Sequence, residues 1–233
     1  MPKMYRCRYL AHGLYIHYDR FRHCHLSIHS PNERNNNYIM PYTGPKDKVD
    51  WEKLFEIKKE LVENMRYGNI PAFCKGCHWI EEFDENSDEQ FETDFDKYID
   101  MIWIGHSNRC NACCIYCFSY KEIQEKRTIK GYDILPLFKE MLEKKIYDVE
   151  KERFSHISFS MGEPTILKNF DKIIDIFDKF DNKCFVLYSN GINRSKVAER
   201  VIARSDKDMR IVISLDAGSR EVFKKIKKVV EKT

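Results

Sequence analysis

Three cysteines near the middle of the chain have the spacing of a metal centre. Cys110, Cys114 and Cys117 form a C-x3-C-x2-C pattern that closely follows the apolar run 101–104. Cysteine thiolates are the usual ligands of iron-sulfur clusters. Three thiolates this close in sequence can hold three irons of a cubane cluster and leave the fourth iron open for chemistry. The spacing therefore predicts a [4Fe-4S] cluster, with these three residues as its catalytic metal ligands.

A zinc site is the alternative interpretation of the same run. With Cys113 included, the cysteines form two C-x2-C pairs, which is the ligand spacing of zinc knuckles. Zinc ribbons place such pairs on separate hairpins, because one tetrahedral ion must be approached from two sides. Two adjacent pairs do this poorly, so the pattern favours the iron-sulfur cluster. Cys113 is then either a spectator or a rearranged ligand.

The run resembles the signature of the radical S-adenosylmethionine (radical SAM) enzymes, because an aromatic residue, Tyr116, directly precedes the third cysteine. The resemblance implies a partial (βα) barrel of the TIM type and a cluster whose open iron binds S-adenosylmethionine. It also implies that Tyr116 packs near the adenine through its backbone. In such enzymes one electron splits the sulfonium, and the resulting 5'-deoxyadenosyl radical takes a hydrogen atom from a substrate.

Three later segments resemble the cofactor-binding segments of the same family. After the apolar run 156–161, Gly162 and Glu163 resemble the family's Gly-Gly-Glu, with Met161 in place of the first glycine. The resemblance implies that Glu163 receives the amino group of S-adenosylmethionine. Ser189 and Asn190 follow the run 184–188 and resemble the family's Thr-Asn-Gly. Ser214 and Asp216 end the run 209–217, and the resemblance implies contacts with the ribose hydroxyls and the methionine carboxylate.

Helical segments alternate with these four strands. Apolar residues recur at helical spacing over residues 133–145 and 169–180, and residues 195–203 and 220–231 supply two more helices. Four βα units predict a parallel sheet with the functional loops at the carboxyl ends of its strands. The family's barrel usually has six units, so strands five and six are missing here. We expect either a fragment, or completion by another chain or by a closing segment that the sequence does not identify. The fourth strand is then an exposed edge.

The first hundred residues contain a second set of cysteines. These are Cys7, Cys24, Cys74 and Cys77, the last two forming a C-x2-C pair whose intervening glycine allows a tight loop. The set resembles part of the SPASM region, which carries auxiliary clusters in radical enzymes acting on peptides. A second [4Fe-4S] cluster is therefore predicted. The alternative is a zinc site with Cys74 and Cys77 as one knuckle, completed by Cys7, Cys24, His23 or His25. We expect a cysteine-rich module over residues 1–95 and a radical SAM core over residues 96–233.

Several elements are expected within the N-terminal part. A hairpin is predicted with strand 14–18, a turn at Asp19 and Arg20, and a return to Cys24. Residues 51–67 are predicted to form an amphipathic helix. The stretch 31–45 has the Pro, Asn and Gly content of a loop, and the acidic run 81–89 is expected to be a solvated linker.

Composition excludes several classes of function. The net charge of +3 is too small to indicate a nucleic-acid partner, and no apolar stretch is long enough for a membrane span. Nine cysteines without a secretory signal indicate a reducing cytoplasm and metal binding in place of disulfides. Cys184 begins an apolar run and is expected to be a buried thiol.

The resemblance to SPASM-containing enzymes implies an enzyme that modifies a peptide or protein, and the radical SAM resemblance implies an electron donor such as flavodoxin or ferredoxin. A small-molecule substrate remains open. A non-catalytic zinc- or iron-sulfur-binding module is the alternative, and it would need neither Glu163 nor the pair Ser214 and Asp216.

Overall fold

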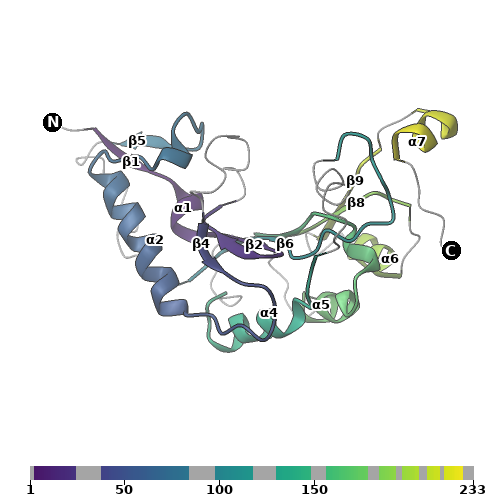
Figure 1. The fold of residues 1–233 in the computed structure, drawn as a ribbon, viewed down its shortest axis with the longest axis horizontal. Helices are drawn as coiled ribbons and strands as arrows, with labels where there is room; N and C mark the ends of the chain where they lie inside the picture. The colour runs from purple at the N-terminus through teal and green to yellow at the C-terminus, as the bar shows by residue number, and fades with distance from the viewer. Residues whose placement is uncertain are drawn as a thin grey trace.

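The computed structural model (Figure 1) describes most of the chain around one large sheet. The residues described are 3–24, 38–83, 98–117, 130–147, 156–177, 184–192, 196–204, 209–215 and 218–227. The seven strands of the large sheet lie in the order β4-β3-β2-β6-β7-β8-β9. Their bounds are β2 Gly13–His17, β3 Arg20–Arg22, β4 Tyr38–Pro41, β6 Met101–Gly105, β7 His156–Phe159, β8 Cys184–Ser189 and β9 Met209–Ile213.

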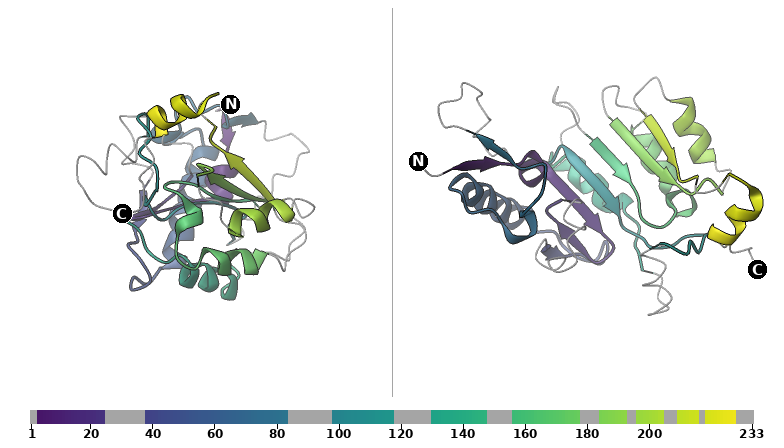
Figure 2. Two further views of the ribbon diagram at one scale, coloured as in Figure 1. Left: turned by 90° about the vertical axis from the view of Figure 1, so that its right-hand side faces the viewer. Right: turned by 90° about the horizontal axis from the view of Figure 1, so that it is seen from above.

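Five neighbouring strands of this sheet are parallel. β2 pairs with β6, β6 with β7, β7 with β8 and β8 with β9, all in parallel register. The remaining two strands, β3 and β4, are added antiparallel beyond β2. Figure 2 shows the strands side by side from above. The mixed α/β class with a largely parallel sheet is therefore confirmed, and this sheet is consistent with a partial radical SAM barrel.

Helices cover one face of the sheet. α4 (Leu135–Glu143), α5 (Phe170–Phe177) and α6 (Lys196–Ala203) form a row on this face, whereas α7 (Arg220–Lys227) lies on the other side of the sheet (Figures 1 and 2). The connections are β6-α4-β7-α5-β8-α6-β9-α7. All four helices lie within the predicted helical ranges, and residues 178–180, 195 and 228–231 of those ranges lie outside the described residues.

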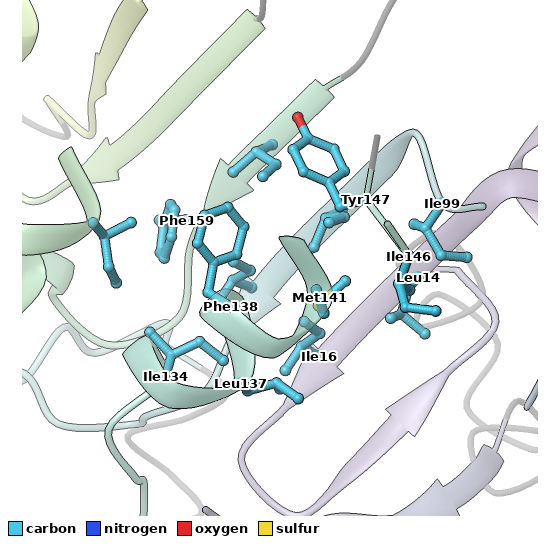
Figure 3. Packing of buried hydrophobic residues seen from close by; sticks show 14 of the residues in the cluster. Leu14, Ile16, Ile99, Ile134, Leu137, Phe138, Met141, Ile146, Tyr147 and Phe159 are labelled. Atoms are coloured by element: carbon cyan, nitrogen blue, oxygen red, sulfur yellow. The ribbon is translucent and has the colours of Figure 1, made fainter. Parts of the chain in front are cut away.

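The main core lies between the sheet and this row of helices. Alternate residues of each parallel strand point toward the helices, as the two-residue period of a strand requires. Leu14 and Ile16 of β2 pack with Phe138 and Met141 of α4, with Phe159 of β7 nearby (Figure 3). These five side chains are almost fully buried. Both faces of β6 are buried, so the apolar run 101–104 folds here as a central strand.

The N-terminal residues add a second layer at one end of the sheet. A two-stranded antiparallel sheet pairs β1 (Met4–Arg6) with β5 (Glu81–Phe83). α1 (Arg8–His12) and α2 (Trp51–Arg66) pack against each other, and a 3-10 turn, η2, spans Ala72–Cys74. No helix in the described ranges is long and apolar enough to cross a membrane.

Lys58 joins α2 to the start of the sheet from a buried position. Its Nζ donates to the carbonyl oxygens of Leu10 and Gly13, at 2.6 and 2.7 Å. Burial lowers the pKa of Lys58 to about 7, and the neighbouring cysteines Cys24 and Cys7 act in the opposite direction. Lys58 thereby supplies a donor to carbonyl groups in the last turn of α1 and just after it, where partners within the helix run out.

Two N-terminal predictions are confirmed and two are wrong in part. The hairpin is present as β2 and β3, and the predicted helix 51–67 is α2. Tyr38–Pro41, however, is strand β4 and not part of a loop, because it pairs with β3 at the sheet edge. Glu81–Phe83 is strand β5 and not linker, because it pairs with β1. Residues 31–37 and 84–89 of these two stretches lie outside the described residues.

The sheet crosses the boundary predicted between residues 95 and 96. β2 lies before that boundary and pairs over its full length with β6, which lies after it. Strands from both parts therefore share one core. The division into a cysteine-rich module, 1–95, and a core, 96–233, stays a prediction.

Candidate cluster-binding site at the ends of the parallel strands

The three predicted cluster ligands lie in the loop that leaves the carboxyl end of β6. The first residues of this loop, His106, Ser107 and Asn108, are buried. Asn108 exchanges bonds with Lys130: its N–H donates to the Lys130 carbonyl at 3.0 Å, and its Oδ1 accepts from the Lys130 N–H at 2.7 Å. The root of the loop is therefore fixed, whereas the cysteines that follow are partly exposed.

The cysteine loop offers thiols but does not bring them to one point. Cys110, Cys113 and Cys117 are free thiols, and the Cys117 N–H donates to the Cys114 carbonyl in a tight turn at 3.0 Å. Among the described residues, no three His, Cys, Asp or Glu side chains are grouped closely enough to hold an ion. Metal binding at this loop therefore requires the sulfur atoms to converge.

Cys110 has the best-defined surroundings of the four. Burial raises the pKa of its thiol, while donors from Ala112 and Asn190 act in the opposite direction. The Ala112 N–H lies 3.4 Å from the Cys110 Sγ, and the Asn190 Nδ2 lies 3.5 Å from it. N–H groups that point at sulfur favour the thiolate, which is the form that binds metal.

Gly162 allows the loop after β7 to pack directly on the cysteine loop. A Cβ atom at Gly162 would overlap the carbonyl oxygen of Arg109 and would stand 2.8 Å from that of Ser107. Gly162 also has a φ of +63°, and Met161 before it has a φ of +69°. Positive φ is uncommon for a non-glycine residue, so Met161 adopts a conformation that suits the glycine found there in the family motif.

Glu163 is completely buried, and its carboxylate accepts four hydrogen bonds from neighbouring residues. Its Oε1 accepts from the Thr165 Oγ1 at 2.6 Å, the Ser189 Oγ at 2.9 Å and the Thr165 N–H at 3.3 Å. Its Oε2 accepts from the Asn190 N–H at 2.7 Å. The Glu163 N–H in turn donates to the Arg109 carbonyl at 2.8 Å. The residue thus ties the loop after β7 to the loops after β6 and β8.

Ser189 and Asn190 lie at the end of β8, beside Glu163. The Asn190 Nδ2 reaches the cysteine loop, where it donates to the Asn111 Oδ1 at 2.8 Å. The Ser189 Oγ also accepts from the Gly191 N–H at 3.1 Å. The structure therefore brings together Cys110, Glu163, Ser189 and Asn190, which the sequence places on three different strand ends.

The remaining predicted contacts are less closely joined to this group. Ser214 is exposed just after β9, and its N–H donates to the Ser189 carbonyl at 2.9 Å. Asp216 lies outside the described residues. Tyr116 is 57% exposed at the far end of the cysteine loop. Next to it, the Ile115 N–H donates to the Ile226 carbonyl of α7 at 3.0 Å, so the last described helix touches this loop.

The second set of cysteines gathers around α1 and the 3-10 turn η2. Cys7 precedes α1 and packs in one apolar cluster with Cys74, at the end of η2. Burial raises the pKa of Cys7 to about 11, and Cys24 and Cys77 lie close enough to add to this rise. Three segments distant in sequence therefore bring these thiols near one another, although among the described residues they are not grouped closely enough to hold an ion as they stand. His23, the predicted alternative ligand, is buried there against Phe73, while His25 lies outside the described residues.

Three residues of the site were not among the predicted ones. Asn111 and Thr165 bond the side chains of Asn190 and Glu163, and Arg109 accepts from the Glu163 N–H. Arg109 contributes only its backbone carbonyl, which no side-chain pattern reports. For Thr165 the sequence contains a weak indication of this contact. It lies two residues after Glu163 in a turn, where a hydroxyl can bond a side chain two residues away.

Known proteins match the part of the chain that contains these loops. Residues 104–233 match the family described as Radical SAM superfamily. GTP 3',8-cyclase of Clostridium botulinum strain Okra is 30% identical over 133 residues, which are 56% of this chain and 39% of the cyclase. The GTP 3',8-cyclases of strains Hall and ATCC 19397 match with the same identity and coverage. The chain spans about two-fifths of the length of these curated relatives. No solved structure is significantly similar to it.

Proposed function

Because this chain belongs to the radical SAM superfamily, whose pattern its residues 104–233 match, we propose that Cys110, Cys114 and Cys117 ligate a [4Fe-4S] cluster. The chain then acts as a radical SAM enzyme. The observation that carries the proposal is the position of the C-x3-C-x2-C loop within this match, at the carboxyl end of a central parallel strand. In α/β folds of this kind, functional loops gather at that edge of the sheet.

The residues present fit the implied cluster and cofactor. Thiolates are the ligands that iron-sulfur clusters require, and N–H donors already point at Cys110. The glycine at position 162 leaves room for two backbone carbonyls to approach the loop after β7. When bound, the cluster and S-adenosylmethionine supply a 5'-deoxyadenosyl radical that removes hydrogen from a substrate. The chain itself positions these groups and excludes water.

For S-adenosylmethionine we propose the segments that end β7, β8 and β9. Gly162 and Glu163 receive its amino group. Glu163 is fully buried, so the loops around it must open for the amino group to reach the Oε2, which accepts one bond in the described residues. Ser189 and Asn190 lie beside that carboxylate. Ser214 and Asp216 meet the ribose and the methionine carboxylate, and the backbone of Tyr116 lies near the adenine. Ser214 is linked to Ser189 through its backbone, which supports a shared site.

A second metal site is proposed on Cys7, Cys24, Cys74 and Cys77. Its support is the packing of Cys7 with Cys74 and the electrostatic effect of Cys24 and Cys77 on Cys7. The likeness of this set to a SPASM region favours an auxiliary [4Fe-4S] cluster, and zinc is the alternative. Either metal is compatible with four thiolate ligands.

The proposed substrate is a peptide or protein, as the likeness to SPASM enzymes favours. A purine nucleotide is the second candidate, because the curated relatives from C. botulinum are named GTP 3',8-cyclases. The electron donor is proposed to be a flavodoxin or ferredoxin. Incubation of the reconstituted protein with S-adenosylmethionine, dithionite and either GTP or a candidate peptide separates the two classes, because only the true substrate is converted to a new product, detected by its retention and fragmentation in liquid chromatography with mass spectrometry.

The first experiment is to measure iron, sulfide and zinc after anaerobic reconstitution. We expect about 8 irons per parent chain and about 4 in the Cys110/Cys114/Cys117 triple Ala variant, one cubane for each site. The matched control is Cys113→Ala, which removes a thiol from the same loop and should keep the parent's iron. A parent with about 4 irons and about one zinc would assign zinc to the N-terminal set. A parent chain that binds zinc and no iron would overturn the proposed enzyme function.

A further inference from the structure

Asn190 reaches the cysteine loop with an amide whose orientation is fixed. Its Oδ1 accepts from the Ile192 N–H at 2.9 Å. The amide nitrogen must therefore be the atom that faces the other way, toward the Asn111 Oδ1 at 2.8 Å and the Cys110 Sγ at 3.5 Å. An amide oxygen in that place would face the Asn111 oxygen and the Cys110 sulfur. Neither atom can donate a hydrogen bond to it when Cys110 is a thiolate. The hydrogen-bond pattern thus selects an N–H group next to Cys110.

The backbone of Asn190 is held by the buried carboxylate of Glu163. The Asn190 N–H donates to the Glu163 Oε2 at 2.7 Å, and the neighbouring Ser189 Oγ donates to the Glu163 Oε1 at 2.9 Å. Glu163 is fully buried, so this anchor does not depend on exposed side chains. A continuous chain of bonds therefore runs from Glu163 through Asn190 to the sulfur of Cys110.

A donor at this place acts on a cluster more strongly in one oxidation state than in the other. Reduction adds negative charge, which spreads over the ligand sulfur atoms. An N–H group pointing at such a sulfur stabilises the reduced form more than the oxidised form, and it therefore raises the reduction potential. The effect requires only that Cys110 ligates the cluster through the sulfur that Asn190 already faces.

We propose that Asn190 is a positioning residue for the cluster, donating from its Nδ2 to the Cys110 sulfur and thereby making the bound cluster easier to reduce. This rests on the proposed function, since it takes Cys110 as a ligand. It differs from a role in binding S-adenosylmethionine, because the contact is with the cysteine loop. The step concerned is the uptake of one electron, from the 2+ to the 1+ state of the cluster.

The test is the reduction potential of the reconstituted cluster, measured without S-adenosylmethionine so that contacts with that cofactor contribute nothing. The full chain is titrated with dithionite in the presence of redox mediators, and the 1+ state is followed by its electron paramagnetic resonance signal. Asn190→Ala removes the donor. Asn190→Asp keeps the side-chain shape and an acceptor for the Ile192 N–H, and it replaces the donor by an oxygen. It therefore tests the loss of the donor even if Asn190→Ala folds poorly.

We expect both variants to keep the parent's iron content and to be harder to reduce. At a fixed solution potential the ratio of reduced to oxidised cluster should fall about tenfold in Asn190→Ala, which for one electron equals a shift of about 59 mV. It should fall further in Asn190→Asp. Thr165→Val is the matched control: it removes a hydroxyl bond to the Glu163 Oε1, leaves every bond of Asn190 in place and should leave the potential unchanged.

The outcomes separate the inference from the function on which it rests. Equal potentials in the parent and in both Asn190 variants, with iron retained, would overturn the inference and leave the proposed function standing. A shift in Thr165→Val as large as that in Asn190→Ala would also overturn it, because a general loosening of the loops would then explain both. A parent without iron would overturn the proposed function, and the inference with it.

Discussion

Replacing Glu163 with glutamine should destabilise the protein by about 3 kcal/mol, although the two side chains have nearly the same shape. The carboxylate accepts four hydrogen bonds in a fully buried position. An amide nitrogen in place of Oε1 would face three donors, so the less costly orientation places it at Oε2. There it faces the Asn190 N–H and loses one bond to a charged acceptor, which is worth about 1.5 to 3 kcal/mol.

The three bonds that remain in Glu163→Gln become weaker, since their acceptor is no longer charged, and this brings the total to about 3 kcal/mol. Urea unfolding followed by circular dichroism measures the effect. With an m-value of about 3 kcal/mol/M, the midpoint should fall by about 1 M at an unchanged m-value. Ser189→Ala and Thr165→Val are the matched controls. Each removes one donor and keeps the carboxylate, so each should cost about 1 kcal/mol.

A midpoint for Glu163→Gln within about 0.3 M of the parent, at equal m-value, would refute this reasoning, because the loss should be about 1 M. It would mean that the four bonds to the carboxylate are not formed in solution as the structure has them. Binding of S-adenosylmethionine to the reconstituted variant is a separate measurement. A variant that is destabilised and still binds the cofactor would show that the carboxylate holds the loops together without contacting the amino group.

Two further predictions concern neighbouring positions. Gly162→Ala should cost more than about 3 kcal/mol and reduce the iron bound after reconstitution, since its Cβ would overlap the Arg109 carbonyl. Gly76→Ala is its control, with a φ of +76° and open space around it, and urea unfolding should show a loss of only about 1 to 2 kcal/mol. Burial lowers the pKa of His106 to about 4. The unfolded chain, but not the folded one, therefore binds a proton there between about pH 6.5 and pH 4. Lowering the pH from 7.5 to 5 should cost the parent about 2 kcal/mol more than His106→Phe, and parallel pH profiles of the urea midpoints would contradict this.

The central strands could be predicted from the sequence because burial on both faces leaves a strong local pattern. The apolar runs 101–104 and 184–188 correspond to β6 and β8, and helix 51–67 to α2. Each of these segments carries its signal in its own residues. The same holds for the order of the βα units, which follows from the alternation of the two patterns.

The short edge strands could not be predicted in this way. Tyr38–Pro41 and Glu81–Phe83 have three or four residues each, and their strand structure depends on distant partners. In β5, Glu81 and Glu82 form ion pairs with Arg6 and Lys3 of the N-terminal segment. A run of acidic residues has the composition of a solvated segment unless those opposite charges lie beside it.

The site shows the same division between local and distant information. The motif spacing predicted which residues lie at the strand ends, and the structure brings Cys110, Glu163, Ser189 and Asn190 together there. The pairing of Asn190 with Cys110 joins residues 80 positions apart, and the burial of Glu163 depends on donors 26 and 27 positions later. Such contacts follow from how loops meet after folding, and no spacing rule contains them.

The parallel pairing of β2 with β6 has a consequence for the synthesis of the protein. Gly13 pairs with Met101, 88 positions later in the chain. Ribosomes add about 5 to 20 residues per second, so about 4 to 18 seconds pass between the emergence of the two strands. During that interval Leu14 and Ile16 of β2, which the finished sheet buries completely, have no partner on the β6 side. The nascent chain therefore exposes the apolar face of the β2–β3 hairpin for seconds. Such a face is the kind of surface that chaperones at the ribosome bind.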